Sequence, residues 1–170
     1  MKRRLVRAAA AVAACALAFV GCAPDNTLSG SLGELLSLDV SRMEVRRNDQ
    51  ALQVTYLRNR GIFLDVVARL SVSLEDLTIV PGARIPLEGQ TDAGTWRASV
   101  VHAPGGEPVR NLPNVKKGDM VVLEGGQIGE MTKGNFSMVF ESEGGDLGQG
   151  RTLVGTFAGT AMDAGYGELP

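Results

Sequence analysis

The sequence predicts an all-β fold, a single antiparallel β-sandwich or barrel of about eight or nine short strands. Hydrophobic and polar residues alternate with a period of two over much of the chain, as they do in strands that bury one face. The chain contains 22 glycines and 7 prolines, and these residues separate the alternating segments. No stretch beyond the amino-terminal region has the hydrophobic period of a long amphipathic helix.

The composition is that of one ordinary globular domain. The chain has 170 residues, of which 44% are hydrophobic and 21% are charged, and its formal net charge is −2. An aromatic content of 5% and the absence of a tract rich in Lys and Arg argue against a nucleic-acid partner. Two cysteines are too few for a disulfide framework or a cysteine-based zinc site, and nothing in the composition requires a cofactor.

The amino terminus has the layout of a secretory signal peptide. Basic residues within Met1–Arg7 precede an uncharged segment that runs from Ala8 to Cys22. This segment has 15 residues, whereas a helix needs about 20 to cross the hydrocarbon core of a bilayer. We therefore expect residues 1–21 to be a signal peptide rather than a permanent transmembrane helix.

The second cysteine, Cys22, lies at the end of this segment. The string Phe19-Val20-Gly21-Cys22 resembles the lipobox of bacterial lipoproteins, which usually has leucine at the position of Phe19. The resemblance implies that Cys22 receives a diacylglyceryl thioether, that the bond between Gly21 and Cys22 is cut, and that the new amine is acylated. Because Cys15 would be lost with the signal peptide, the exported chain would have no free thiol.

Three other interpretations of this region remain open. Ala16-Leu17-Ala18 fits an ordinary signal-peptidase site, which would release a soluble exported protein. Val12-Ala13-Ala14-Cys15 is also similar to a lipobox, but only Ala8–Ala14 would remain as the apolar core of the signal. Cys22 could also be a small hydrophobic residue at the end of an uncleaved helix.

The resemblance also implies a location in the cell envelope. Ala23 and Pro24 differ from the aspartate-type signal that retains lipoproteins at the inner membrane, so the outer membrane is expected. Removal of residues 1–21 takes away four basic residues and changes the net charge from −2 to −6. Attachment would then come from the acyl chains rather than from charge. The membrane is the expected partner, another envelope protein is a further candidate, and the oligomeric state is left open.

The composition changes after the cysteine. Turn formers and small polar residues fill positions 23–34, so we expect residues 22–36 to comprise the lipidated cysteine and a flexible tether. Twelve such residues reach at most about 40 Å. The antiparallel β domain would then span residues 37–170.

Two turns set the expected register of the first three strands. Asn48-Asp49 suits a two-residue hairpin turn, and Asn59-Arg60-Gly61 suits a three-residue turn that closes on a left-handed glycine. Each turn independently places the same apolar side chains on one face, whereas the opposite face, which includes Asp65, is expected to be solvated. The expected inward set is Met43, Val45, Leu52, Val54, Tyr56, Leu64, Val66 and Ala68, with Val45 opposite Leu52 and Tyr56 opposite Leu64.

Further strands follow, with proline and glycine between them. Pro86 marks its segment as an edge strand, because proline cannot donate a ladder hydrogen bond. Gly155 and Gly159 leave one face of the last strand with little bulk, which predicts the close approach of another element. The alternation places the Trp96 and Tyr56 rings inward, so we expect core packing rather than a sugar-stacking platform. The expected segments are Leu77–Val80, Ile85–Leu87, Thr95–Ala103, Met120–Glu124, Phe136–Glu141 and Arg151–Met162.

Few residues suggest chemistry. His102 is the single histidine, and without a Gly-x-Ser-x-Gly motif we expect it to be a surface residue at a strand end. Glu141, Glu143 and Asp146 lie in a glycine-rich stretch and are weak candidates for a Ca²⁺ site. Their spacing matches no EF-hand, so a solvated hairpin loop is the favoured interpretation.

The sequence therefore favours a lipid-anchored, non-enzymatic β domain that serves as a binding or scaffold module. The first alternative is an exported hydrolase that uses carboxylates such as Asp65, Glu124 or Glu141, which would require two of them about 5–10 Å apart in a pocket. The second alternative is a module that binds a small ligand or Ca²⁺.

Overall fold

A computed structural model describes residues 26–142, 147 and 150–164 of the chain. These residues form ten β-strands and one short 3-10 helix, which confirms the all-β prediction. In this part of the chain there is no helix with the length and apolar character that crossing a membrane requires. The elements are β1 (Thr27–Ser29), η1 (Ser31–Glu34), β2 (Arg42–Arg47), β3 (Ala51–Arg60), β4 (Phe63–Ser73), β5 (Arg84–Pro86), β6 (Ala98–Ala103), β7 (Arg110–Asn111), β8 (Val115–Glu124), β9 (Met131–Phe140) and β10 (Thr152–Asp163).

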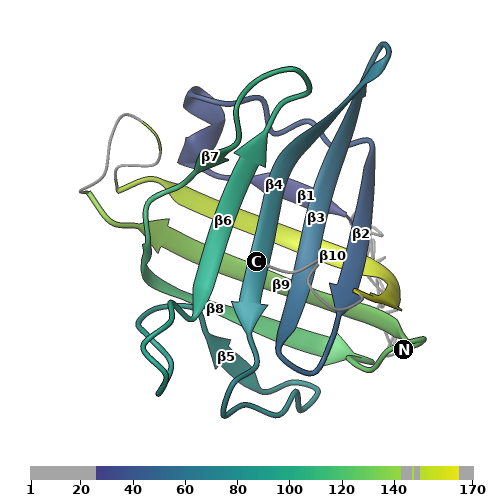
Figure 1. The fold of residues 1–170 in the computed structure, drawn as a ribbon, viewed down its shortest axis with the longest axis vertical. Coiled ribbons are helices and arrows are strands. Elements are labelled where there is room, and N and C mark those ends of the chain that lie inside the picture. Colours follow the sequence, from purple (N-terminus) through teal and green to yellow (C-terminus); the bar gives the residue numbers. More distant parts are fainter. Residues whose placement is uncertain (1–25, 143–146, 148–149, 165–170) are drawn as a thin grey trace, which may run out of the picture.

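The strands form one strongly curled sheet (Figure 1). Hydrogen-bonded neighbours run in the order β5-β8-β9-β10-β2-β3-β4-β6-β7, and β1 also pairs with β10. The end position of β5 confirms the edge strand predicted from Pro86. Every pair is antiparallel except β10 and β2, which run parallel with Ala161 opposite Val45. This pair makes the sheet mixed rather than wholly antiparallel as expected.

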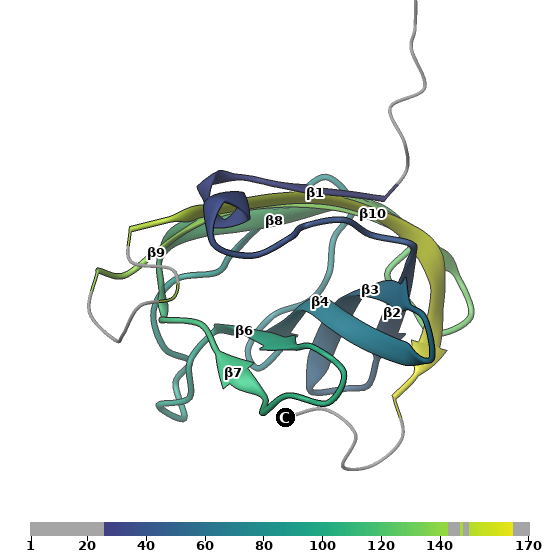
Figure 2. The ribbon, with the colours of Figure 1, turned by 90° about the horizontal axis from the view of Figure 1, so that it is seen from above.

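Strand β10 joins the two halves of the sheet. Its first residues pair with β1, and its last residues pair with β2. Figure 2 shows that the sheet bends here, so that two layers face each other around a common core. We call β1, β5, β8, β9 and β10 the β9 layer, and we call β2, β3, β4, β6 and β7 the β3 layer.

The core lies between these two layers. Tyr56 from the β3 layer and Phe136, Phe140 and Phe157 from the β9 layer are its largest buried side chains. The Tyr56 and Phe136 rings meet edge to face, with centroids 6.1 Å apart. A Cβ atom added at Gly155 would lie 2.6 Å from the Phe136 ring. The close approach predicted at Gly155 is therefore confirmed.

The turn of the first hairpin lies one residue later in the chain than predicted. Val45 lies opposite Val54 rather than Leu52, and the chain reverses over Asp49-Gln50. The Asn48 side chain explains the shift, because its Oδ1 accepts hydrogen bonds from the backbone N–H groups two and three residues later, at 2.9 and 2.8 Å. Since the pairing moves by two residues, every inward side chain keeps its face.

The second hairpin contains a β-bulge that the sequence pattern did not reveal. Tyr56 lies opposite Ala68 rather than Leu64, because the chain reverses over Gly61-Ile62 instead of the predicted Asn59-Arg60-Gly61 and because the register shifts again between Tyr56 and Leu57. Beyond the bulge the alternation is reversed, so Asp65 is fully buried, whereas Leu64 is 43% exposed and Val66 lines the outer surface. The predicted inward positions of Leu64 and Val66 are therefore wrong, as is the predicted solvation of Asp65.

Part of the expected tether belongs to the fold. Strand β1 pairs with β10, and the Asn26 Oδ1 accepts a 2.8 Å hydrogen bond from the backbone N–H of Ala158. Leu32 is fully buried in the core, and Leu28 and Leu36 pack against it. Because these leucines bury apolar surface, the tether interpretation does not hold for residues 26–36. Gly21 and Cys22 lie outside the described residues.

Two other segments are corrected. Leu77–Val80 forms no strand, because it is a short segment between two turns, closed by hydrogen bonds from the Leu77 N–H to the Leu74 carbonyl at 3.0 Å and from the Ala83 N–H to the Val80 carbonyl at 2.9 Å. The short strand β7, which was not among the expected segments, pairs with β6 through Asn111 and Val101.

Candidate functional site

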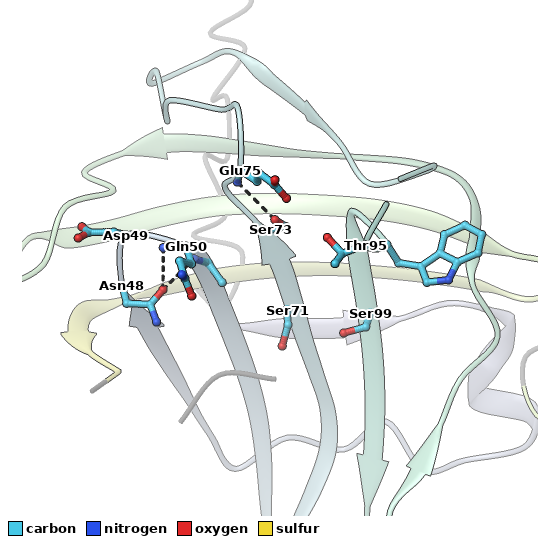
Figure 3. Close-up of a pocket in the computed structure, with 10 residues that line it drawn as sticks. Asn48, Asp49, Gln50, Ser71, Ser73, Glu75, Thr95 and Ser99 are labelled. Atoms are coloured by element: carbon cyan, nitrogen blue, oxygen red, sulfur yellow. Dashed lines mark hydrogen bonds between the residues drawn. The ribbon is translucent and has the colours of Figure 1, made fainter. Parts of the chain in front are cut away.

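A pocket of about 470 Å³ lies on the outer face of the β3 layer, beside the β2–β3 turn (Figure 3). Its walls come from that turn, from the ends of β4 and β6, and from the loop that precedes β6. We call it the Trp96 pocket. Its lining residues are Asn48, Asp49, Gln50, Ala51, Ser71, Ser73, Glu75, Thr95, Trp96 and Ser99.

Trp96 corrects the prediction that this ring packs in the core. It is 43% exposed and lines the pocket. The reason is that β6 begins only at Ala98, so the strand alternation does not extend to Trp96, which makes a single bridge to Gln90. Tyr56, in contrast, lies in the core as predicted.

Arg97 fixes the wall that carries Trp96. Its Nη1 donates hydrogen bonds to the backbone carbonyls of Ser73, at 3.2 Å, and Glu75, at 2.6 Å. The backbone N–H of Ser73 donates in return to the Arg97 carbonyl at 2.8 Å. The Arg97 side chain is mostly buried, so these charge-assisted bonds hold the end of β4 against the Trp96 segment.

The β2–β3 turn forms the facing wall. The hydrogen bonds accepted by Asn48 hold this turn in one conformation and leave the exposed Asp49 and Gln50 at the pocket rim. The Gln50 carbonyl accepts a 2.7 Å hydrogen bond from the backbone N–H of Leu74, which ties the turn to the end of β4. Both walls are therefore built before any ligand arrives.

The chemistry of the lining is polar and acidic around one aromatic ring. Hydroxyl and amide groups can both donate and accept hydrogen bonds, whereas the carboxylates of Asp49 and Glu75 accept only. Among the described residues that line the pocket, none carries a positive charge. Such a site favours an uncharged or cationic ligand with many hydroxyl groups and an apolar face for Trp96.

A second pocket, of about 510 Å³, lies on the outer face of the β9 layer. Arg84 and Asp119 line it and form an ion pair of 3.1 Å with each other. The Glu88 carboxylate, also in its lining, accepts a 3.0 Å hydrogen bond from the backbone N–H of Gly118. Three of its charged groups, those of Arg84, Asp119 and Glu88, have partners within the protein, and none of the described residues that line it is aromatic, so the Trp96 pocket is the better candidate.

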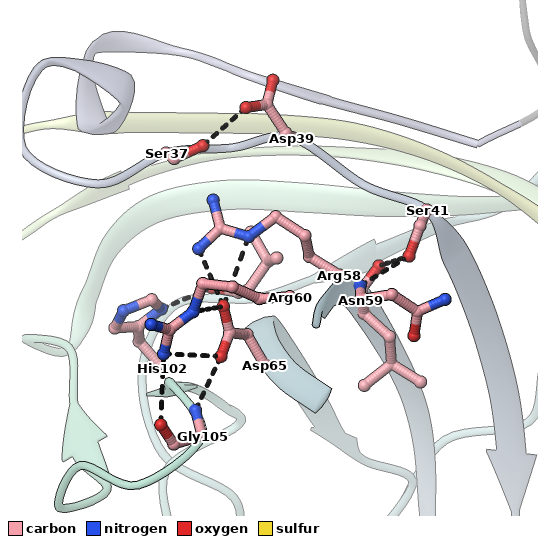
Figure 4. A network of polar contacts seen from close by, with 11 residues as sticks. Ser37, Asp39, Ser41, Arg58, Asn59, Arg60, Asp65, His102 and Gly105 are labelled. Carbon is pink, nitrogen blue, oxygen red and sulfur yellow. Dashed lines mark hydrogen bonds and ion pairs between the residues drawn. The ribbon is translucent and has the colours of Figure 1, made fainter. Parts of the chain in front are cut away.

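Asp65, a candidate for the hydrolase alternative, lies in a polar network at the other end of the β3 layer (Figure 4). Its carboxylate accepts hydrogen bonds from Arg58 Nη2 at 2.9 Å, Arg60 Nε at 3.1 Å and the backbone N–H of Gly105 at 2.7 Å. The hydrogen bonds from Arg60, Gly105 and Arg58, in that order, hold the pKa of Asp65 well below its ordinary value. A carboxylate that stays ionised and fully engaged is suited to fixing the Gly105 loop, not to transferring protons.

The other two hydrolase candidates lie far apart. Glu124 forms a 3.1 Å ion pair with Lys133, near one end of β9, whereas Glu141 follows the other end of β9. Eight residues of extended strand separate Lys133 from Glu141, which corresponds to about 27 Å. Glu124 and Glu141 therefore do not form a catalytic pair.

His102 is buried rather than at the surface as predicted. It follows Ala98 and Val100 on the inward face of β6, and its Nδ1 donates a 2.9 Å hydrogen bond to the Val67 carbonyl. The surface prediction failed because the inward alternation of β6 continues to the end of the strand. This hydrogen bond gives the ring a structural role.

The candidate Ca²⁺ ligands are only partly described. Glu141 lies within the described residues, where its Oε2 accepts a 3.4 Å hydrogen bond from Asn114 Nδ2. Glu143 and Asp146 lie outside them. Within the described ranges, no group of three or more His, Cys, Asp or Glu side chains is arranged to hold a metal ion.

The sequence analysis missed the Trp96 pocket, although one signal was available. The turn that ends at Gly94, whose N–H donates to the Thr91 carbonyl at 2.9 Å, lies two residues before Trp96 and delays the start of β6. The partners of Arg97 could not be found in the sequence, because they depend on where β4 ends in space. Comparison of the chain with protein-family models, with curated proteins and with solved structures finds no match.

Proposed function

We propose that this protein is an exported, lipid-anchored envelope protein whose β domain binds an uncharged saccharide in the Trp96 pocket, without enzymatic activity. The lipobox-like string that ends at Cys22 supports the anchor, and the pocket supports the binding function. The observation that carries the binding proposal is the half-exposed Trp96 beside hydroxyl, amide and carboxylate groups.

A saccharide fits this site for two reasons. The C–H face of a pyranose is apolar and can pack on the exposed indole, while its hydroxyl groups can pair with Ser99, Thr95 and the acids of the rim. Because Asp49 and Glu75 give the rim a negative charge, anionic saccharides are expected to bind more weakly than neutral ones.

The binding experiment uses Trp96 as its own reporter, since the chain contains one tryptophan. The acylated protein, purified from membranes, is titrated with maltotetraose, cellotetraose and an N-acetylglucosamine tetramer, and tryptophan emission and heat are recorded. We expect at least one neutral tetrasaccharide to shift the emission and to release heat saturably. If none of the three does so, the saccharide proposal is wrong.

Two matched variants locate the binding site. Ser99 and Ser137 are exposed serines on the outer faces of the two different layers. Ser99→Leu fills the Trp96 pocket and should abolish tetrasaccharide binding, whereas Ser137→Leu should leave it unchanged. Equal binding by both variants would contradict the assignment of the site.

The same samples test the non-enzymatic part of the proposal. Asp49 and Glu75 are two carboxylates in one pocket, and a glycoside hydrolase uses a pair of carboxyl groups about 5–10 Å apart. After prolonged incubation the tetrasaccharides should be recovered intact by mass spectrometry. Release of shorter saccharides by the wild type, but not by Glu75→Gln, would establish hydrolysis instead.

The anchor has its own test. Cys22→Ala should move the protein from the membrane fraction to the soluble periplasmic fraction, because the thioether could not form. Mass spectrometry of the wild type should find an acylated amino terminus at Cys22. An unchanged membrane fraction for Cys22→Ala would exclude lipidation at this position as the anchor.

A further inference from the structure

Exposed apolar side chains gather at one end of the β9 layer. Ile128, Met131 and Met162 are 50%, 53% and 44% exposed. Met131 lies on β9 opposite Thr160 of β10, and the Gly129 N–H donates to the Ala161 carbonyl at 2.8 Å. The β8–β9 connection and the end of β10 therefore form one surface, which Figure 1 shows on the same side of the molecule.

Two more apolar residues extend this surface. Leu123 is 52% exposed near the end of β8, and Val80 is 55% exposed in the loop beside it. The Gly82 N–H donates a 2.8 Å hydrogen bond to the Val122 carbonyl, which holds that loop against β8. We call Val80, Leu123, Ile128, Met131 and Met162 the apolar end. Large apolar groups gathered in this way on a soluble domain mark a contact surface.

The start of the described chain lies next to this surface. Strand β1 runs antiparallel to β10, so following it backward to Asn26 leads toward the carboxyl end of β10. The hydrogen bond between Asn26 and Ala158 fixes this position. The spacing between neighbouring strands, from β1 across β10 to β9, and the rise along β9 together place Met131 about 14 Å from Asn26.

The chain between Cys22 and Asn26 is short. Four residues span at most about 14 Å, because an extended residue covers no more than about 3.6 Å. The distance from Asn26 to an acylated Cys22 would therefore be no greater than the distance from Asn26 to Met131 in the apolar end. Acyl chains inserted in a bilayer would bring this end of the domain to the bilayer surface.

We propose that the apolar end rests in the interfacial region of the bilayer, so that the domain is held in one orientation. This inference depends on the proposed lipid anchor at Cys22. The Glu124–Lys133 ion pair beside the apolar end has no net charge, and the exposed Glu130, whose carboxylate accepts a 3.1 Å hydrogen bond from the backbone N–H of Gln127, adds a negative one, so anionic lipid would not strengthen the contact. The partner is the acyl–headgroup boundary of a neutral bilayer.

The orientation has a consequence for the opposite end. Arg47 at the end of β2 pairs with Asp163 at the end of β10 and with Leu52 of β3. From Leu52, strand β3 runs away from the apolar end for eight residues, about 27 Å, to Arg60 at the β3–β4 tip. Ile62 at this tip is 95% exposed and would point away from the membrane.

A labelling experiment tests the orientation, because the exported acylated chain would have no other free thiol. Ile128→Cys and, as the matched control, Ile62→Cys are purified from membranes in acylated form. Each is labelled with an environment-sensitive fluorophore and reconstituted into phosphatidylcholine vesicles. Lipids with a nitroxide quencher near the headgroup are included at increasing density, and circular dichroism checks that each variant is folded.

We expect the label at position 128 to lie about 5–10 Å into the interface and to be quenched several-fold more than the label at position 62. Equal quenching of the two labels, whether strong or weak, would overturn the orientation while flotation with the vesicles still supports the anchor. A blue-shifted but unquenched label at position 128 would also overturn it, and would indicate protein contact. Failure of the acylated protein to float with vesicles would instead overturn the anchor itself.

Discussion

The Tyr56 hydroxyl donates a 2.8 Å hydrogen bond to the backbone carbonyl of Thr156, across the core from the β3 layer to the β9 layer. Burial raises the pKa of the Tyr56 phenol far above its ordinary value, so this group stays a donor. Gly155 makes the contact possible, because a Cβ atom there would lie 2.9 Å from the Tyr56 hydroxyl. The two layers are thus joined by a polar contact inside an apolar core.

Removing this hydroxyl should destabilise the fold. Tyr56→Phe keeps the ring and its contact with Phe136 but leaves the Thr156 carbonyl without its side-chain donor. The free energy of unfolding should fall by about 1–3 kcal/mol, the usual cost of leaving a buried polar group unpaired. Urea unfolding followed by far-ultraviolet circular dichroism measures this change. Equal free energies for the variant and the wild type would mean that the hydrogen bond contributes nothing.

A methyl group at Gly155 should have a larger effect than one at Gly159 on the same strand. At Gly155 the added Cβ would meet the Phe136 ring at 2.6 Å, whereas at Gly159 its nearest neighbour is the flexible Met43 Cε at 3.2 Å. Gly155→Ala should lower the free energy of unfolding by about 1–3 kcal/mol through overpacking. Gly159→Ala serves as the control and should cost less. The reverse order of stabilities would contradict the packing described for β10.

The Asp65 network should make stability depend on pH in acid. Since the pKa of Asp65 is lowered in the folded state, its contribution to stability is present above the unfolded-state pKa of about 3.9 and is lost as pH falls through the folded-state value. Asp65→Asn should therefore be less stable than the wild type at neutral pH, and the difference should shrink progressively below about pH 4. Thermal unfolding between neutral and acidic pH measures this difference.

Asp119→Asn is the control for this experiment. Asp119 pairs with Arg84, whose side chain is 78% exposed, so solvent screens the interaction. The stability of Asp119→Asn should follow that of the wild type throughout the pH range. A constant difference between Asp65→Asn and the wild type at every pH would show that the carboxylate charge does not cause the effect.

The period-two pattern was sufficient to predict the fold class and most of the inward side chains. It worked for Val45 and Tyr56 even though both registers were wrong, because errors of two or four residues in pairing preserve the face of every residue. It failed at Leu64, where a bulge inserts one residue and reverses the alternation. No local residue preference marks that bulge, which depends on how β4 pairs with its two neighbours.

The candidate site was less predictable than the fold. Trp96 was assigned to the core by extending an alternation into a segment that is not yet a strand. The Trp96 pocket joins the β2–β3 turn to residues almost fifty positions away, so its shape is set by long-range packing that one sequence does not contain. Asp65 was assigned to solvent because the bulge in β4 was not foreseen, and its partner Gly105 comes from a loop distant in sequence.

Arg97 should be necessary for both the stability of the fold and the shape of the Trp96 pocket. Arg97→Ala removes the donors to the Ser73 and Glu75 carbonyls, so the free energy of unfolding should fall by about 1.5–3 kcal/mol. Tetrasaccharide binding should weaken as well, because the end of β4 would no longer be held against Trp96. Arg84→Ala, at an exposed ion pair, is the matched control and should change neither quantity appreciably. Loss of stability with unchanged saccharide affinity would show that Arg97 supports the fold but not the pocket.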